Sequence, residues 1–456
     1  MQIWINKNDN EMPDKNFDDT YVFSLNREEY STIYSNISDT WLRLGALSIS
    51  SIYEDLFVIA ISIFAVDKRV SRSLFTDCWT RELNLSIPVI ELEKWEAVRL
   101  LWNKTLNFLT GDLWNINFRK SENLYSLRTR QSRNRIDISG CDVVSLFSGG
   151  LDSFCGAIEL LKQGKSPCLF GHNEYPKLRL KQEGLCELFQ SEYPSQTVKF
   201  LSFTANSRAP YAKIGKLAGS ENTSRGRSLL FLCSALTVAG VIEEHTPVYI
   251  PENGFIGLNI PLTNSRKGTC STRTTHPFFL DNFRSIVENV GIQNPIINLY
   301  AYMTKREIVN SVKDTNSFKQ GYASTISCSH PCLPRWDKNG NNEYPKNCGY
   351  CYPCLIRKSS LIDEVDKNEP YSYESVSMTF LNIFAESDRV SDLSAVISTI
   401  FRYKTVDDNE IKRLIRCTGQ LSNDEIEKFL RVYKKTMRDL IELFSTDEKM
   451  KAYIGI

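Results

Sequence analysis

From residue 142 onward, short apolar runs alternate with longer segments whose apolar residues recur at helical spacing. The runs that are typical of buried strands cover residues 142–147, 166–171, 197–203 and 247–250. The intervening segments that are typical of amphipathic helices cover residues 154–163, 177–193 and 227–240. Alternating strands and helices predict a doubly wound parallel sheet, so we expect an α/β fold with this unit as its core.

The residues on either side of this unit show other patterns. Apolar runs at 56–66 and 81–89 predict strands, and residues 91–110 place apolar side chains at near-helical spacing. We therefore expect an α+β N-terminal domain over residues 1–138. Residues 361–456 lack strand character and predict a helical C-terminal region. The α/β unit then occupies residues 139–360.

Charge and hydropathy narrow the range of partners and locations. The 456 residues include 55 lysines and arginines and 54 aspartates and glutamates. The net charge is therefore close to zero and does not attract a nucleic acid or an anionic membrane. The longest apolar run, at 56–66, is too short to span a bilayer, and the N-terminus lacks a basic-then-apolar signal segment. We expect a cytoplasmic protein that binds neither nucleic acid nor membrane.

The first predicted strand ends in the hexapeptide Ser-Gly-Gly-Leu-Asp-Ser, residues 148–153. Its glycines allow a tight turn and close approach of a ligand, and the amides of the following helix point at an anion. The candidate nucleotide-binding residues are Ser148, Gly149, Gly150, Leu151, Asp152 and Ser153. The carboxylate of Asp152 predicts a Mg²⁺ ion that bridges it to phosphate oxygens, as expected for a bound nucleoside triphosphate.

No Gly-Lys-Ser or Gly-Lys-Thr follows these glycines, so the turn differs from the common phosphate-binding P-loop. It resembles the PP-loop instead. That resemblance implies cleavage of ATP between its α and β phosphates and adenylation of a substrate. An ordinary Gly-Gly turn is the alternative, but the match at all six positions between a predicted strand and a predicted helix favours the nucleotide site.

Five of the thirteen cysteines lie between residues 328 and 354. Cys348, Cys351 and Cys354 form C-x-x-C-x-x-C, and either Cys328 or Cys332 can supply a fourth thiolate, of which we favour Cys328. Four thiolates predict a closed, structural, tetrahedral Zn²⁺ site. An iron–sulfur cluster uses the same ligands and is the alternative.

The hexapeptide and the cysteine motif are separated by two further segments. In chain order, residues 148–153 are followed by Thr304-Lys305-Arg306-Glu307-Ile308, Ile326-Ser327-Cys328 and Cys348-Gly-Tyr-Cys-Tyr-Pro-Cys354. Over about residues 140–360 the chain thereby resembles QueC, the 7-cyano-7-deazaguanine synthase family. The resemblance implies a HUP-like ATP pyrophosphatase core that adenylates the carboxylate of 7-carboxy-7-deazaguanine. In QueC, ammonia then displaces AMP, and a second activation converts the amide to a nitrile.

Two further segments, Pro251-Glu252-Asn253-Gly254 and residues 271–277 (Ser-Thr-Arg-Thr-Thr-His-Pro), resemble QueC-like proteins of bacterial anti-phage systems, QatC of the Qat system and its relatives in type IV CBASS. This subgroup implies a carbon–nitrogen ligase that passes the activated carboxylate to the N-terminal amine of a partner protein. The additional N-terminal domain and helical region favour that acceptor, because they can build a docking surface. A synthase that uses ammonia in queuosine-type biosynthesis and a non-catalytic ATP-binding scaffold are the alternatives.

Four residues outside the hexapeptide are candidates for the nucleotide side of the site. Arg225 and Arg227 precede a predicted helix, where guanidinium groups can meet phosphate oxygens, although they can equally be a surface pair. Lys305 is a candidate counter-charge for the α-phosphate, and an exposed helix N-terminal lysine is the alternative. His172 ends the second strand and is a candidate for the adenosine site. We expect Asp152, Lys305 and Arg227 to take part in the chemistry.

Four other residues are candidates for binding the deazaguanine. Glu252 and Asn253 follow a predicted strand end, where they can pair with a guanine-like edge, or Asn253 can simply form a turn. Arg273 and His276 lie in a threonine-rich loop suited to a carboxylate or pyrophosphate. For His276, a structural loop histidine is the favoured alternative.

Overall fold

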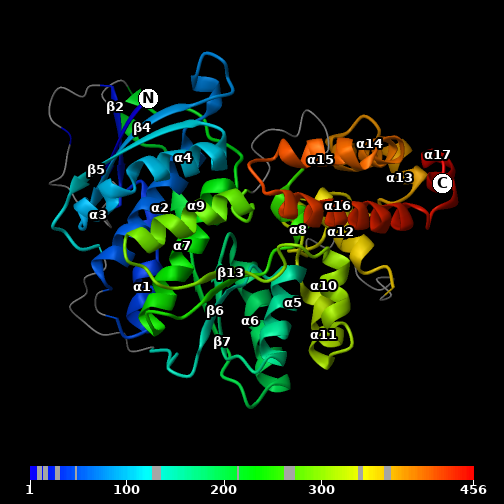
Figure 1. Cartoon of the computed structure of the whole chain (residues 1–456), viewed down its shortest axis with the longest axis horizontal. Helices are drawn as coiled ribbons and strands as arrows, with labels where there is room; N and C mark the ends of the chain where they lie inside the picture. Colours follow the sequence, from blue (N-terminus) through cyan, green and yellow to red (C-terminus); the bar gives the residue numbers. More distant parts are fainter. Residues whose placement is uncertain are drawn as a thin grey trace.

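The computed structural model of the protein describes residues 1–7, 13, 19–25, 31–46, 49–125, 135–212, 215–260, 273–336, 343–363 and 371–456. In Figure 1 the N-terminal elements lie at the upper left and the C-terminal helices at the right. The segment around β6 and β7 lies below them. The molecule is an α/β protein whose two larger sheets consist of parallel strands.

The larger sheet contains five parallel strands in the order β13-β12-β6-β7-β8. These strands are β6 (Val143–Leu146), β7 (Pro167–His172), β8 (Lys199–Phe203), β12 (Val248–Ile250) and β13 (Ile296–Asn298). The first four confirm the strands predicted from the apolar runs, and β13 was not predicted.

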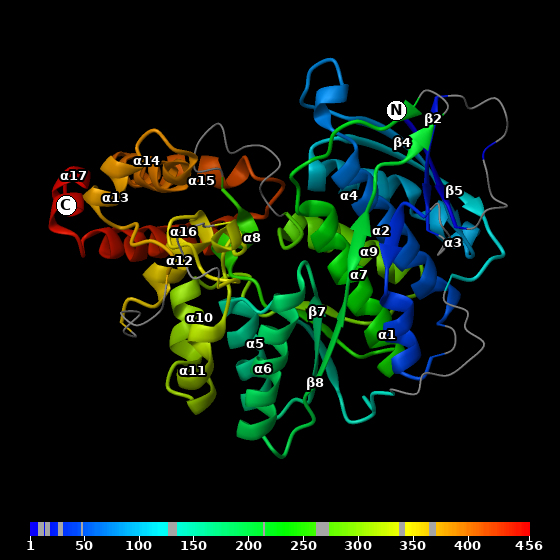
Figure 2. The ribbon, with the colours of Figure 1, turned by 180° about the vertical axis from the view of Figure 1, so that it is seen from behind.

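Helices cover both faces of this sheet. Its connecting helices are α5 (Leu151–Lys162), α6 (Pro176–Glu192) and α7 (Arg225–Ile242). The helices α5 and α6 lie on one face (Figure 2), where their apolar residues form one core cluster, whereas α7 belongs to a separate cluster. This placement follows from right-handed crossovers, because the chain adds strands in one direction from β6 to β8 and then returns to β12. The predicted doubly wound sheet is therefore confirmed.

The strand order reverses between β6 and β12. In open parallel sheets, ligands bind beyond the carboxyl ends of the strands at such a reversal. Ser148 follows β6, and Glu252 follows β12. Two of the predicted ligand-binding segments therefore meet at this point.

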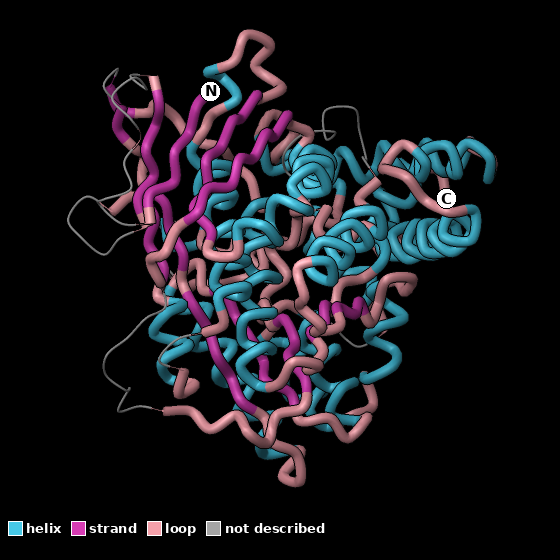
Figure 3. The backbone as a smooth tube through the Cα atoms, turned by 60° about the vertical axis from the view of Figure 1, so that its left-hand side comes forward, coloured by secondary structure: helices cyan, strands magenta, loops and turns pink. Residues whose placement is uncertain are grey.

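The N-terminal sheet is parallel, which corrects the α+β arrangement expected there. Its order is β2-β1-β4-β5, and its strands lie side by side at the upper left of Figure 3. The strands are β1 (Gln2–Asn6), β2 (Thr20–Ser24), β4 (Glu82–Val89) and β5 (Leu113–Lys120). The helices α3 (Leu92–Ala97) and α4 (Arg99–Thr110) confirm the prediction of helix over 91–110.

The strand predicted at 56–66 is wrong, because these residues lie within the helix α2 (Ser51–Arg69). Every residue from Leu56 to Val66 is buried, and α2 packs against both β4 and α7. A helix that is apolar all round shows no 3.6-residue periodicity, so its sequence looks like a buried strand. Close packing of α2 on α7 requires glycine at Gly226 and Gly240, since a Cβ at Gly240 would overlap the Tyr53 ring.

Among the described helices, α7 is the one with the length and apolar composition of a membrane span. Its 18-residue window is 67% buried, between α2 and the larger sheet. Core packing therefore accounts for the apolar character of α7.

The C-terminal region, residues 361–456, is helical, as predicted. It contains α13 (Met378–Ile383), α14 (Ser391–Thr405), α15 (Asp408–Arg416), α16 (Asn423–Phe444) and α17 (Glu448–Ile454), and α12 (Tyr352–Ser360) ends just before it. Its core includes Cys348, Cys351 and Leu355, and the core of the N-terminal sheet likewise extends onto α7. Apolar packing therefore crosses both of the boundaries expected at residues 138 and 360.

The remaining elements connect these layers. The short strand β3 (Ile33–Ser35) pairs with β9 (Ala205–Ser207), and β10 (Tyr211–Ala212) pairs with β11 (Gly215–Lys216). The helix α1 (Ile37–Arg43) contacts β8, and α9 (Pro277–Asn289) contacts α4. The other helices are α8 (Gly254–Leu258), α10 (Lys305–Val312) and α11 (Asn316–Gly321).

Candidate functional site

The glycine turn lies between β6 and α5, as its sequence context predicts. Gly150 is the N-cap of α5, and Gly149 has a φ of +80°, a left-handed conformation that favours glycine. The Oγ atoms of Ser148 and Ser153 lie 3.2 Å apart. The turn thus directs two hydroxyls and the N-terminus of α5 toward the same place, which suits an anion.

Asp152 and Lys305 come together at the floor of this turn. Lys305 Nζ lies 2.8 Å from Asp152 Oδ1, and the two side chains are 8% and 9% exposed. Lys305 is the first residue of α10, whose N-terminus is fixed by a reciprocal capping box between Thr304 and Glu307. Two of the three residues predicted to take part in the chemistry therefore form one buried ion pair.

Asn253 holds the other oxygen of Asp152. Its Nδ2 donates to Asp152 Oδ2 at 2.6 Å, while its Oδ1 accepts from the backbone N–H of Ile256 at 3.0 Å as the N-cap of α8. Both ends of this amide therefore bind the protein. Its side chain thereby positions Asp152, and pairing of Asn253 with a substrate stays a prediction.

Glu252 lies beside this pair and lines the cavity above the turn. Burial, followed by the charge of Asp152, raises the pKa of Glu252 to about 8. Two carboxylates thus face a single ammonium group. Carboxylate oxygens are the ligands that Mg²⁺ prefers, so Asp152 together with Glu252 could hold such an ion.

Two adjoining cavities lie at the carboxyl ends of β6 and β12. The first, the reaction cavity, has a volume of about 350 Å³ and contains the turn, Glu252 and Lys305 in its wall. The second, the apolar cavity, has a volume of about 300 Å³ and includes Phe231 in its wall. The residues common to both are Ser148, Ser153, Arg227, Pro251 and Glu252. Together they offer space for a small ligand beside a nucleotide.

His172 and Arg227 lie where predicted, at the edge of these cavities. Burial, followed by the charge of Arg227, lowers the pKa of His172 to about 3, so its ring is neutral at physiological pH. Its Nε2 has no hydrogen-bond partner among the described residues. Arg227 forms an ion pair with Glu174. Both predicted residues are therefore available to a ligand in the apolar cavity, which they line.

Arg225 and Arg273 contact α4 and are not among the residues that line the two cavities, so their predicted roles in ligand binding gain no support. The Arg225 guanidinium donates to the carbonyl of Thr110 at the end of α4. Arg273 donates to the carbonyl of Phe108 at 3.0 Å, and its guanidinium lies 5.4 Å from the Phe108 ring centroid. Both arginines therefore hold the chain against α4.

The side chain of His276 makes structural contacts, in agreement with the favoured alternative of a structural loop histidine. Its Nδ1 accepts from the backbone N–H of Phe278 as the N-cap of α9, and its Nε2 lies 3.0 Å from Thr418 Oγ1. The neighbouring Thr274 and Thr275, which were not singled out, line the apolar cavity. Residues 271 and 272 of the same motif lie outside the described residues.

The cysteine cluster assembles as the spacing predicts. The Sγ atoms of Cys328, Cys348, Cys351 and Cys354 all lie within 4.8 Å of one another, and the group excludes Cys332. Two of the Sγ–Sγ distances are 3.9 Å. Four sulfurs at about 2.3 Å from one tetrahedral ion would be roughly 3.8 Å apart. The group can therefore hold a metal such as zinc, with Cys328 as the fourth ligand.

Hydrogen bonds that the sequence did not signal connect this cluster to the glycine turn. Asn347 accepts from the N–H of Ser327 at 3.0 Å and donates to the carbonyl of Thr325 at 3.1 Å. The buried guanidinium of Arg357 donates to Thr325 Oγ1 at 2.6 Å. Ser327 Oγ in turn accepts from the N–H of Leu151 at 3.1 Å. The cysteine loop thereby positions the first turn of α5.

No family model matches the sequence.

Proposed function

We propose that the protein is a PP-loop, QueC-like, ATP-dependent carbon–nitrogen ligase of the cytoplasm. It adenylates the carboxylate of 7-carboxy-7-deazaguanine and transfers the acyl group to the N-terminal amine of a partner protein in anti-phage defence. One observation carries the proposal: Asp152, Lys305 and Glu252 converge on the glycine turn at the reversal of strand order. That is where parallel α/β sheets bind their ligands.

The two cavities suit the two substrates of such a ligase. The apolar cavity, with His172 and Phe231 in its wall, suits the adenosine moiety of ATP. The phosphates would then lie against Ser148, Ser153 and the N-terminus of α5. The reaction cavity, which Glu252 also lines, would hold the deazaguanine carboxylate beside the α-phosphate.

In the first step, a carboxylate oxygen attacks the α-phosphorus, and pyrophosphate leaves with the electron pair of the broken P–O bond. Negative charge builds up on the α-phosphate oxygens, where the fixed ammonium group of Lys305 would stabilise it. Asp152 and the capping box of α10 keep Lys305 in place. Asp152 and Glu252 are the residues that would hold Mg²⁺, and the bound ion would supply positive charge beside the phosphates.

In the second step, an unprotonated amine attacks the acyl carbon. A C–N bond forms, the C–O bond to the phosphate breaks, and AMP leaves with the electron pair of that bond. The amine nitrogen loses one proton in the process. That proton passes to solvent water.

The cysteine group belongs to the same proposal as a structural Zn²⁺ site. Four thiolates leave no open position for water or substrate, so the ion would not take part in the reaction. Its role would be to fix the loop that contains Asn347 and Ser327, and through that loop the first turn of α5.

Co-expression tests the proposal directly. The chain is produced with proteins encoded next to it, in cells that make 7-carboxy-7-deazaguanine, and the intact mass of each protein is measured. We expect one protein to gain the mass of a deazaguanine amide at its N-terminus, and we expect the Asp152→Asn variant to produce none. Equal masses with the wild-type protein and the variant would contradict the proposal.

A further inference from the structure

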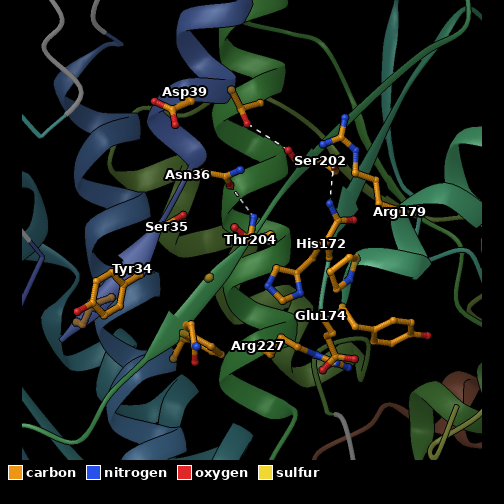
Figure 4. A pocket seen from close by; sticks show the side chains of 18 of the residues that line it. Tyr34, Ser35, Asn36, Asp39, His172, Glu174, Arg179, Ser202, Thr204 and Arg227 are labelled. Atoms are coloured by element: carbon orange, nitrogen blue, oxygen red, sulfur yellow. Dashed lines mark hydrogen bonds and ion pairs between the residues drawn. The ribbon is translucent and has the colours of Figure 1, made fainter. Parts of the chain in front are cut away.

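A third cavity, larger than the other two, lies between the N-terminal elements and the larger sheet. This outer cavity has a volume of about 890 Å³ and is bounded by β3, α1 and the carboxyl ends of β7 and β8 (Figure 4). Much of its wall consists of neutral polar side chains, including Ser35, Asn36, Asn173, Ser202 and Thr204. A cavity of this size takes a ligand of many atoms, far larger than ammonia.

The outer cavity adjoins the site already described. His172, Glu174 and Arg227 line both the outer and the apolar cavity, and Arg227 lines all three. Figure 4 shows these three side chains gathered at the end of β7. The ion pair of Glu174 with Arg227 therefore lies where the outer cavity adjoins the other two.

Hydrogen-bonding groups of the outer cavity are left for a ligand. Asn36 accepts from the N–H of Thr204 at 2.7 Å, so part of the wall is internally satisfied. Asn173 donates to Ser202 Oγ at 2.9 Å, but its buried Oδ1 has no partner among the described residues, and neither does His172 Nε2. Buried polar atoms are nearly always paired, so two of them along one cavity indicate a polar ligand.

The wall of the outer cavity contains more cations than anions. The cations are Arg43, Lys68, Arg179 and Arg227, and the anions are Asp39 and Glu174. Although burial raises the pKa of Glu174, the Arg227 guanidinium and Lys68 hold it below its ordinary value, so this residue is an anion. Four cations against two anions fit a ligand with acidic side chains.

We infer that the outer cavity admits an extended polypeptide segment whose free N-terminal amine passes Glu174 and whose next residues, acidic ones preferred, face Arg43 and Arg179. This inference rests on the proposed function, since its second step requires an amine. A peptide N–H group would pair with the buried, unpaired Oδ1 of Asn173, and the neutral polar wall would meet the remaining backbone groups. The covalent change is the displacement of AMP described above.

The test compares a large and a small amine on the purified full chain. The protein receives ATP and 7-carboxy-7-deazaguanine together with either hydroxylamine or a pool of random hexapeptides with free N-termini, and an N-acetylated pool serves as the blank. The variant Thr204→Trp places an indole in the outer cavity, from an exposed position. The matched control is Thr405→Trp, an exposed threonine of α14.

We expect Thr204→Trp to lower the yield of peptide amide roughly tenfold or more, because access of the amine sets its effective concentration. Its hydroxamate yield should match that of the wild type, which also shows that the variant is folded. Thr405→Trp should leave both products unchanged. Equal peptide yields from the two tryptophan variants would overturn the inference. So would a wild-type protein that forms hydroxamate but no peptide amide. Either result would leave the proposed adenylation step standing.

Charge provides a second readout. Pools with aspartate or glutamate at positions two to four should react several-fold better than pools with lysine or arginine there. Arg179→Glu should reverse that preference, while Lys177→Glu, an exposed residue of the same helix outside the cavity wall, should keep it. No preference in the wild type would overturn the inferred match between acidic side chains and the cationic wall. Failure of the wild type to form any hydroxamate would contradict the proposed function, and the inference would fall with it.

Discussion

Lys305 Nζ lies 2.8 Å from Asp152 Oδ1, and each of these residues occupies the first turn of its own helix. The two helices start at different edges of the site, so the pair fixes α10 against α5. A buried ion pair of this kind contributes little net stability, because desolvation offsets the attraction. Its value lies in holding an ammonium group at a fixed position beside a phosphate-binding turn.

Replacement of Lys305 should therefore affect the chemistry most. We expect Lys305→Met to lower the rate of ATP–pyrophosphate exchange, in the presence of 7-carboxy-7-deazaguanine, by roughly 10²- to 10³-fold, as for the loss of one charge-stabilising group. Lys319→Met, at an exposed position of α11, is the control and should retain the wild-type rate. A loss of less than tenfold in Lys305→Met would exclude the assigned role.

Glu252 should make stability depend on pH. Its pKa is raised from 4.5 to about 8 in the folded protein, so between these values the folded state binds more protons than the unfolded state. The free energy of unfolding should thus fall as pH rises through this range, by up to about 1.4 kcal/mol per pH unit from this group. Urea unfolding without added divalent cation measures this slope. Glu252→Gln should flatten it, and an identical slope in the variant would count against the buried, protonated carboxyl.

The cysteine group should bind one zinc ion per chain. We expect Cys351→Ser to lose the metal and several kcal/mol of stability, because its sulfur lies in the core of the C-terminal region. Cys332→Ser, outside the group, should keep both. Metal analysis by mass spectrometry and thermal unfolding measure these effects. Iron in place of zinc would show that the cluster is an iron–sulfur centre.

His276 should matter for stability and not for substrate binding. His276→Ala removes the N-cap of α9 and the contact with Thr418, so we expect a loss of about 1–2 kcal/mol. His276→Asn should recover much of it, since asparagine caps helices well. The KM for 7-carboxy-7-deazaguanine should stay at the wild-type value in both variants, whereas a large rise would return His276 to the substrate site.

The larger sheet was predictable because each of its first four strands is a short apolar run followed by turn residues. The helix α2 was not, since burial on all sides removes the periodicity that distinguishes a helix from a strand. The strand β13 was not predicted, because only two of its three residues are apolar, whereas β12 is apolar at all three. The parallel N-terminal sheet depends on pairings between β1, β2 and β4, which no local pattern specifies.

In the candidate site, too, features with a local sequence pattern were predictable and features that depend on remote contacts were not. The hexapeptide and the cysteine spacing are local signals, and the structure brings both together as expected. For Asn253 and His276, residue type alone cannot separate a helix cap from a ligand-binding group, and the deciding partners, Asp152 and Thr418, are remote in sequence. The outer cavity is built from α1, β3, β7 and β8, so its existence required the folded chain.

Isotope transfer tests the central claim, activation of a carboxylate by adenylation. The protein is incubated with ATP, hydroxylamine and 7-carboxy-7-deazaguanine labelled with ¹⁸O in its carboxylate, and the nucleotide products are analysed by mass spectrometry. Adenylation predicts AMP that contains one ¹⁸O atom, with unlabelled pyrophosphate. ADP with labelled inorganic phosphate, or AMP without label, would contradict the account.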